Sequence, residues 1–179
     1  MSLILKDNPV GIDWAIDRIQ KTVFNSVNWD TAVGGYESYH RAYKNESPDG
    51  KIPEVYIGND DYKEVFMDDG FSATSFFMVD DTITQLEEDK YSANVDYVFQ
   101  VLLDELYPSI IHRADEEAHR DVLLAVNDSV IDVEVTDIVK GRENVYSGLR
   151  IDQLECDDMH PYHFFKLGLT VNYIYRCHG

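Results

Sequence analysis

The sequence predicts an α+β domain in which a mostly antiparallel sheet carries two main helices on one face and ends in a long C-terminal strand. Three observations lead to this fold class. Residues 162–177 alternate apolar and polar side chains, which is typical of a half-buried strand. Two other segments, 9–26 and 115–126, repeat apolar residues at helical spacing. The order of helix, strands, helix and strands places the helices against one face of the sheet.

The composition describes a folded and strongly acidic chain. Of its 179 residues, 44% are hydrophobic and 12% aromatic, which favours one domain, residues 1–179, with a real core. The chain has 34 acidic and 15 basic side chains, a formal net charge of -19. This charge repels phosphate backbones and anionic lipid, so we expect no nucleic-acid or membrane-surface binding. It fits simple solubility, and it also fits an acidic surface that meets a basic partner.

The sequence predicts no membrane span and no secretion signal. No segment approaches the roughly 18 apolar residues that a span requires, and residues 1–8 hold no long apolar region. Cys156 and Cys177 are therefore expected to be reduced thiols, although the sequence leaves a disulfide between them open.

The N-terminal half is predicted to contain one helix and three short strands. The helix runs from about Pro9 to Ser26, with Asn8 as its cap and Pro9 in its first turn. Residues 28–53 are predicted to be irregular, with 36–43 as a short helix and 47–50 as a turn. The expected strands are 54–58, 62–67 and 75–79; turns at 59–61 and 68–70 separate them, and an acidic loop, 80–90, follows.

The C-terminal half is predicted to contain the two longest strands. Residues 93–103 alternate as a strand, although a helix competes there, and a helix with an acidic first turn follows at 115–126. A strand at 129–136, a polar loop at 137–145 and a strand at 146–155 come next; residues 157–161 then return the chain in a hairpin-like turn. Residues 162–177 would span on the order of 50 Å. We therefore expect this strand to project beyond its sheet or to pair with a neighbour, with a bulge at Gly168.

No motif in the chain defines a chemistry, so we predict that it is not an enzyme and has no catalytic or cofactor-binding residue. It lacks GxSxG and GxGxxG, and Gly34-Gly35 is not followed by Lys-Ser or Lys-Thr. The nearest nuclease-like pattern, 87–90, lies in a predicted loop. The acidic pairs lack the spacing of a calcium loop; they are Asp60-Asp61, Asp68-Asp69, Asp80-Asp81 and Glu87-Glu88.

The best candidate metal ligands are His160 and His163, which follow Asp157 and Asp158. Residues three apart on a strand face opposite sides, so the two histidines converge only if Pro161 forces a turn. We therefore predict no metal site and interpret the segment as a polar connection. A metal-dependent enzyme that uses these four residues is the competing hypothesis. Cys177-His178 is a weaker candidate.

Tyrosine is used 12 times, often in segments predicted to be loops: Tyr36, Tyr39, Tyr43, Tyr107, Tyr146 and Tyr162. Tyrosine is enriched at protein interfaces because it buries a large area and keeps a polar tip. It is also a good strand residue. In an acidic chain without a catalytic motif, these positions favour a subunit that packs against other proteins.

The element order resembles that of the small neck proteins of tailed bacteriophages, in particular the tail-terminator and tail-completion group. The matching features are the helix at 12–27, the long strand at 93–103, the acidic-start helix at 115–126 and the closing segments 157–162 and 164–173. This resemblance covers most of the chain in element order.

The resemblance implies a structural virion protein that does no chemistry. It would form a homo-oligomeric ring, six- or twelve-fold, at the head–tail junction and contact neighbouring neck and tail proteins, while DNA passes through without specific binding. It would be assembled in the bacterial host cytoplasm and reside in the virion. Residues 44–53 and 68–74 are the candidate arms between subunits. The alternative is a small acidic binding or immunity-type protein that captures a basic protein partner.

Overall fold

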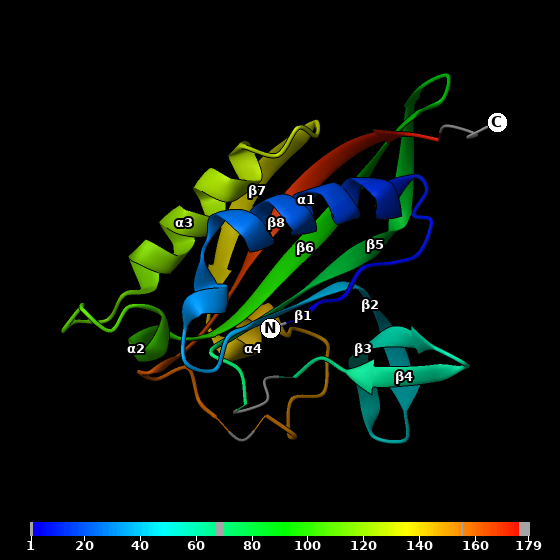
Figure 1. Ribbon diagram of the computed structural model, residues 1–179. Helices are drawn as coiled ribbons and strands as arrows, with labels where there is room; N and C mark the ends of the chain where they lie inside the picture. Colours follow the sequence, from blue (N-terminus) through cyan, green and yellow to red (C-terminus); the bar gives the residue numbers. More distant parts are fainter. Residues whose placement is uncertain (1, 67–69, 155, 176–179) are drawn as a thin grey trace.

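In the computed structural model, which describes residues 2–66, 70–154 and 156–175, the chain forms an eight-stranded sheet with its two long helices on one face (Figure 1). The predicted α+β class with a mostly antiparallel sheet is confirmed. The elements in chain order are β1 (Ser2–Leu3), α1 (Ile12–Ser26), the 3-10 helix η1 (Trp29–Thr31), β2 (Tyr36–Ser47), β3 (Gly50–Gly58), β4 (Asp61–Glu64), β5 (Ala73–Glu87), β6 (Lys90–Leu102), α2 (Leu103–Leu106), α3 (Asp115–Asn127), β7 (Val133–Lys140), α4 (Arg142–Val145) and β8 (Tyr162–Ile174).

The strands lie in the order β4-β3-β2-β5-β6-β8-β7, and β1 adds to the side of β2. The pairs β1–β2 and β2–β5 are parallel, and the other pairs are antiparallel. The longest strands, β5, β6 and β8, therefore lie next to one another in the middle of the sheet, where their apolar residues form the core.

Helices α1 and α3 cover one face of β6 and β8 (Figure 1). Their apolar stripes are buried as predicted; Ile16 and Ile19 of α1 and Val122 of α3 are fully buried. The alternating residues of β6 and β8 face the same core, which includes Phe99 and Phe165. The helical and alternating patterns in the sequence thus describe the two sides of one apolar layer.

The start of α1 differs from the prediction. The helix begins at Ile12, after Gly11 as N-cap, and not at Pro9 after Asn8. Gly11 has a φ of 59°, and a Cβ there would lie 2.5 Å from the ring of Tyr175. Because β1 lies in the sheet and α1 lies above it, residues 4–11 must carry the chain between layers, which delays the helix.

The prediction of an irregular segment with a short helix at 36–43 is wrong, because these residues form β2. This strand lies between β5 and its other neighbours, and its first five residues are all buried. Its polar side chains find partners inside the protein: Ser38 hydrogen-bonds Ser75, and His40 contacts the carbonyl oxygen of Asp13. Burial on both faces removes the alternation that identifies a strand in a sequence.

The second face of the sheet carries a smaller apolar core that α4 and the segment 146–161 cover. The predicted strand at 146–155 is wrong, since the described residues of this segment form turns; the predicted loop at 137–145 holds the end of β7 and α4. Arg142 holds the segment in place by donating to the carbonyl oxygens of Leu154 and Cys156. Residues 157–161 consequently do not return a hairpin; β8 pairs with β6 and β7 instead.

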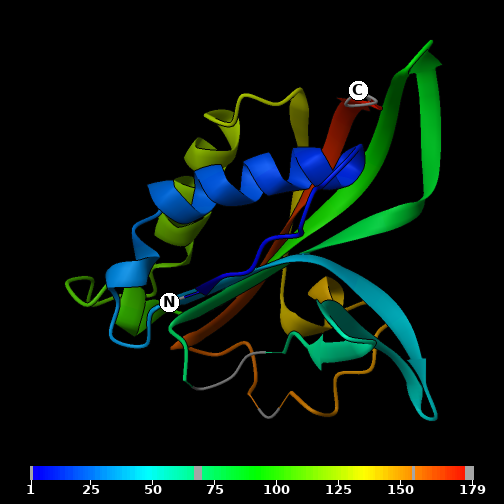
Figure 2. The same cartoon turned by 45° about the vertical axis from the view of Figure 1, so that its right-hand side comes forward.

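The predicted loop at 80–90 is also wrong, because β5 and β6 continue as a hairpin to Glu87 and Lys90. We call residues 80–90 the β5–β6 arm. It projects away from the helix layer, as Figure 2 shows. By contrast, β8 is paired with β6 from Tyr162 to Ile174 and does not extend past its sheet. Beyond Met78, where β2 leaves β5, the sheet therefore continues as β5, β6 and the described part of β8 together.

Gly168 marks an irregularity, as predicted, but the extra residue lies in the neighbouring strand. Pairing between β6 and β8 is regular at Gly168, whereas the register between β7 and β8 shifts between Val135 and Asp137. A Cβ at position 168 would lie 2.7 Å from the hydroxyl of Thr136. Glycine thus makes room for the bulge in β7.

The two predicted arms fall in different environments. Residues 44–53 form the end of β2, its turn and the start of β3, with the predicted turn at 47–50. In the second candidate, 68–74, residues 72–74 are buried at the start of β5 and belong to the core. Residues 68 and 69, the end of the predicted strand 62–67, Glu155 and Cys177-His178 lie outside the described residues. Contacts of either segment with another subunit stay a prediction.

Two further predicted strands have different bounds in the structure. The strand expected at 62–67 is β4, which ends at Glu64, and the strand expected at 129–136 is β7, which begins at Val133. Within the described ranges, the longest helix has 15 residues, and none is long and apolar enough to cross a membrane.

Candidate functional site

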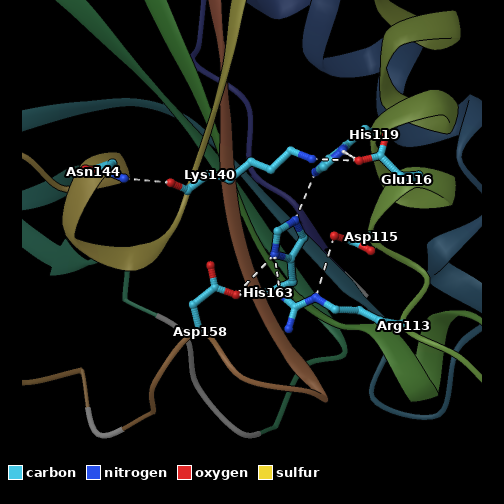
Figure 3. A network of polar contacts seen from close by, with 8 residues as sticks. All are labelled: Arg113, Asp115, Glu116, His119, Lys140, Asn144, Asp158 and His163. Atoms are coloured by element: carbon cyan, nitrogen blue, oxygen red, sulfur yellow. Dashed lines mark hydrogen bonds and ion pairs between the residues drawn. The ribbon is translucent and has the colours of Figure 1, made fainter.

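A network of polar contacts surrounds two buried histidines (Figure 3). His163 lies on β8 and His119 on α3, and both side chains are 2% exposed. Their Nε2 atoms are 2.9 Å apart, so one nitrogen donates a hydrogen bond to the other. The ring of His119 also packs edge-on against Phe165.

The other ring nitrogen of His163 meets both a cation and an anion. Its Nδ1 is 2.9 Å from Nη2 of Arg113 and 3.2 Å from Oδ1 of Asp158. Arg113 also pairs with Asp158 at 2.7 Å and with Asp115 at 3.6 Å. The network therefore joins the loop before α3, the loop before β8 and the strand itself.

On the far side, His119 faces the exposed surface of β7. Its Nδ1 is 3.7 Å from Oε1 of Glu116, and that carboxylate accepts a hydrogen bond from Lys140 at 2.6 Å. Figure 3 shows the chain of contacts from Arg113 through both rings to Lys140, whose carbonyl oxygen accepts from Asn144 of α4. Six segments are thus connected by one network: the loop before α3, α3, β7, α4, the loop before β8, and β8.

Both histidines are held in the neutral form. Burial lowers the pKa of His119, and the neighbouring His163 lowers that pKa further. Burial also lowers the pKa of His163, although the negative charge of the nearby Asp158 opposes the change. Since an arginine can only donate, Arg113 requires Nδ1 of His163 to accept, and Nε2 of His163 then donates to His119.

The burial of this network limits its chemistry. A side chain that is 2% exposed does not reach a dissolved substrate, so the two histidines have no access to one in this conformation. What the arrangement does is fix the start of α3 and the loop before β8 against the sheet. Sequence patterns did not identify His119; its only signal is a polar residue on an otherwise apolar helix face, next to Ala118.

The four residues of the metal hypothesis are divided by the fold. Asp158 and His163 belong to the network, whereas Asp157 pairs with Arg142 at 3.0 Å. His160 is exposed in the loop before β8. Among the described residues, no three His, Cys, Asp or Glu side chains are placed to hold one metal ion.

The second candidate feature is the surface of the β5–β6 arm. Residues 80–87 are all exposed, including Ile83 at 45% and Leu86 at 48%. The arm also carries five carboxylates and one lysine: Asp80, Asp81, Glu87, Glu88, Asp89 and Lys90. An exposed hairpin that mixes apolar and acidic side chains is suited to binding another protein surface.

The tyrosines do not mark an interface in the way the sequence indicated. Tyr36, Tyr39 and Tyr146 are at most 2% exposed and pack inside the two cores, so the inference from loop tyrosines is wrong for these three. The exposed tyrosines include Tyr56 and Tyr62 of the β3–β4 hairpin, which contact edge-to-face at 5.2 Å, and Tyr175 after β8. The pairing of Cys156 with Cys177 stays open, because Cys177 is outside the described residues.

Comparison with known proteins adds no relative: no family model matches the chain, and no curated protein matches its sequence.

Proposed function

We propose that this protein is a structural virion subunit of a tailed phage or prophage that forms a ring at the head–tail junction, acts as a tail terminator or neck protein and joins tail to head without catalysis. The observation that carries the proposal is the β5–β6 arm. It extends the sheet by about eight residues beyond the last pairing between β2 and β5, at Met78.

The arm supports assembly because its outer edge is open. Among the described residues, β5 has no strand partner opposite β6 beyond Met78. Exposed edges of this kind pair readily with other chains, and proteins that stay monomeric usually shorten or cover them. A ring uses a heterologous interface, in which a projection of one subunit contacts a different surface of the next. A long arm on one side of the domain suits that geometry.

The buried histidine network also supports a structural role. Its residues hold α3, β7, β8 and two loops together, and its rings are closed to solvent. The net charge of -19 fits a channel through which DNA passes without adhering, because a lining of carboxylates repels phosphates. In the virion, neighbouring neck and tail proteins would contact the faces of the ring.

One observation favours a second candidate function. The arm's acidic residues, Glu87 to Asp89 above all, also suit the capture of a basic protein, as an acidic binding or immunity-type protein would do. The two candidates differ in self-association. A ring protein associates with itself, whereas a binding module stays monomeric until its basic partner is added.

Analytical ultracentrifugation across concentration, with negative-stain imaging of large species, tests the proposal. We expect closed rings of six or twelve subunits, in dynamic equilibrium with monomer at low concentration. Ile83→Asp should weaken ring formation because it places a charge on the exposed arm, whereas Val33→Asp, at a position 95% exposed outside the arm, should not. A protein that is monomeric at every concentration and binds basic proteins would support the second candidate instead.

A further inference from the structure

A groove opens where β2 and β5 separate. The two strands pair in parallel as far as Ala42 and Met78; beyond that point β2 follows β3 and β5 follows β6 (Figure 2). The groove between them has a volume of about 230 Å³, and Met78 and Val79 are among the residues that line it. We call this groove the fork.

The fork is a basic site in an acidic protein. Arg41, Lys44 and Lys51 line it, together with a single carboxylate, that of Asp81. Two of the cations have partners outside the lining: Arg41 is 3.9 Å from Asp13, and Lys51 is 3.3 Å from Glu46. Lys44 is exposed and forms no ion pair with any residue in the described part of the chain. In a chain with a net charge of -19, such a site attracts an acidic partner.

The walls of the fork are open strand edges. Beyond Ala42, β2 is paired with β3 on one side; beyond Val79, β5 is paired with β6 on one side. Within the residues that the structure describes, the edges that face the fork have no strand partner. Backbone groups at open edges hydrogen-bond to an extended chain or a hairpin that lies along them. The fork therefore fits an acidic hairpin better than a helix or a small molecule.

The protein itself carries an acidic hairpin of this kind. The tip of the β5–β6 arm presents Glu87, Glu88 and Asp89, preceded by Leu86, which is 48% exposed. We propose that the arm tip of one copy docks in the fork of the next copy, with its carboxylates against Lys44 and Lys51. This interface deepens the proposed function, on which it rests, by naming the two surfaces that would join the ring.

The arm tip that docks in a fork must come from another copy of the protein. From Val79 at the fork to Glu87 at the tip, the arm advances by about 26 Å at 3.3 Å per residue. Its second strand is paired with β8 as far as Lys90 and Ile174, so the arm cannot fold back on its own fork. Projection and receptor lie at opposite ends of one rigid segment. A contact between them joins two different surfaces. When it is not returned by the same neighbour, it is heterologous and repeats from copy to copy, and such a series closes into a ring when the rotation between copies permits.

Charge reversal tests the interface in the full-length protein. The fork variant Lys44→Glu/Lys51→Glu and the tip variant Glu87→Lys/Glu88→Lys should each weaken self-association at least tenfold at about 0.1 M salt. The chain that carries all four changes restores opposite charges between positions 87 and 88 of the tip and positions 44 and 51 of the fork, and it should recover most of the lost affinity. Arg18→Glu/Arg120→Glu makes the same charge change as the fork variant, on exposed residues of α1 and α3, and is the matched control for that variant.

The readout is the self-association constant from sedimentation velocity, with circular dichroism to show that each variant is folded. Weakening in both reversed variants with recovery in the four-fold variant supports the docking. If the unaltered protein forms rings and both variants form them equally well, the fork is not the receptor, although the proposed function stands. Equal weakening in the control assigns the effect to net charge and also overturns the docking. If the unaltered protein never self-associates, the docking and the proposed ring both fail.

Discussion

Replacing His119 by glutamine tests the neutral histidine pair directly. The Nε2 of His119 is the atom that contacts His163, and a glutamine side chain can place a hydrogen-bonding atom near that position. Glutamine does not titrate, so the substitution removes one proton-binding group and keeps a polar contact. His160→Gln makes the same chemical change at an exposed position and serves as the control.

The sign of the pH effect on stability depends on whether the folded or the unfolded chain binds the proton of His119 more readily. The pKa of His119 is lowered in the folded protein from an ordinary value of 6.5, so the unfolded chain binds the proton first as the pH falls. The stabilisation from the neutral ring is complete above about pH 6.5 and is lost as the pH falls below it, until the folded protein is protonated too. The same sign holds for His163.

One histidine that is neutral when folded changes the free energy of unfolding by at most about 1.4 kcal/mol per pH unit. Between about pH 7.5 and about pH 5, this amounts to a loss of up to about 2 kcal/mol for His119. We therefore expect the free energy of unfolding of His119→Gln to depend less steeply on pH than that of the unaltered protein, by up to this amount.

Urea unfolding followed by tryptophan fluorescence provides the measurement, at constant ionic strength and in half-unit steps of pH. Trp29 reports on the core because it is 3% exposed and packs against Tyr36 and Phe99. If His119→Gln keeps the pH dependence of the unaltered protein, His119 is not a neutral buried group that binds its proton more readily after unfolding. The same conclusion holds if His160→Gln reduces that dependence by as much as His119→Gln does.

Three further predictions concern stability and are measured by urea unfolding at neutral pH. Gly34→Ala should cost about 1–3 kcal/mol, since its Cβ would lie 2.7 Å from the backbone nitrogen of Ser72, whereas Val33→Ala next to it, 95% exposed, should change stability by less than about 0.5 kcal/mol. Phe99→Ala should cost about 3–5 kcal/mol because this fully buried ring is central to the larger core; a loss below about 1 kcal/mol would contradict that placement. Gln100→Leu should cost about 1–3 kcal/mol, because the side-chain amide of Gln100 donates to the buried carbonyl oxygen of Val65 at 2.6 Å and leucine cannot. A neutral result would mean that this carbonyl finds another donor.

Periodicity predicted the elements that bury one face. The apolar stripes of α1 and α3 and the alternation of β6 and β8 are local properties of the sequence, and the structure buries those residues in one core. The same patterns predicted the α+β class, because amphipathic helices and half-buried strands bury their apolar faces against one another.

Periodicity did not predict β2, because contacts with other strands allow polar side chains to be buried there. The first half of β2 is buried on both faces, so its polar side chains interrupt the pattern of a strand. Glu37 shows why this is tolerated: it accepts a hydrogen bond from Ser2 at 2.7 Å and pairs with Lys63 at 3.3 Å, and both partners come from other strands. No window of sequence contains these partners together.

The sequence did not predict the β5–β6 arm, for the opposite reason. Its first strand is exposed and acidic, and its conformation is imposed by pairing with β6, which is itself anchored to β8. The alternation of Thr82, Ile83 and Thr84 is a weak local signal for a strand, and the acidic residues around it obscured that signal.

The sequence by itself thus determined the fold class, the two long helices, the two central strands and the strong negative charge, because each depends on composition or on the spacing of neighbours along the chain. Only the tertiary structure brought His119 to His163, separated β2 from β5 to open the fork, and carried the acidic arm away from the core. These features depend on contacts between residues far apart in the chain, such as the 44 positions that separate the two histidines.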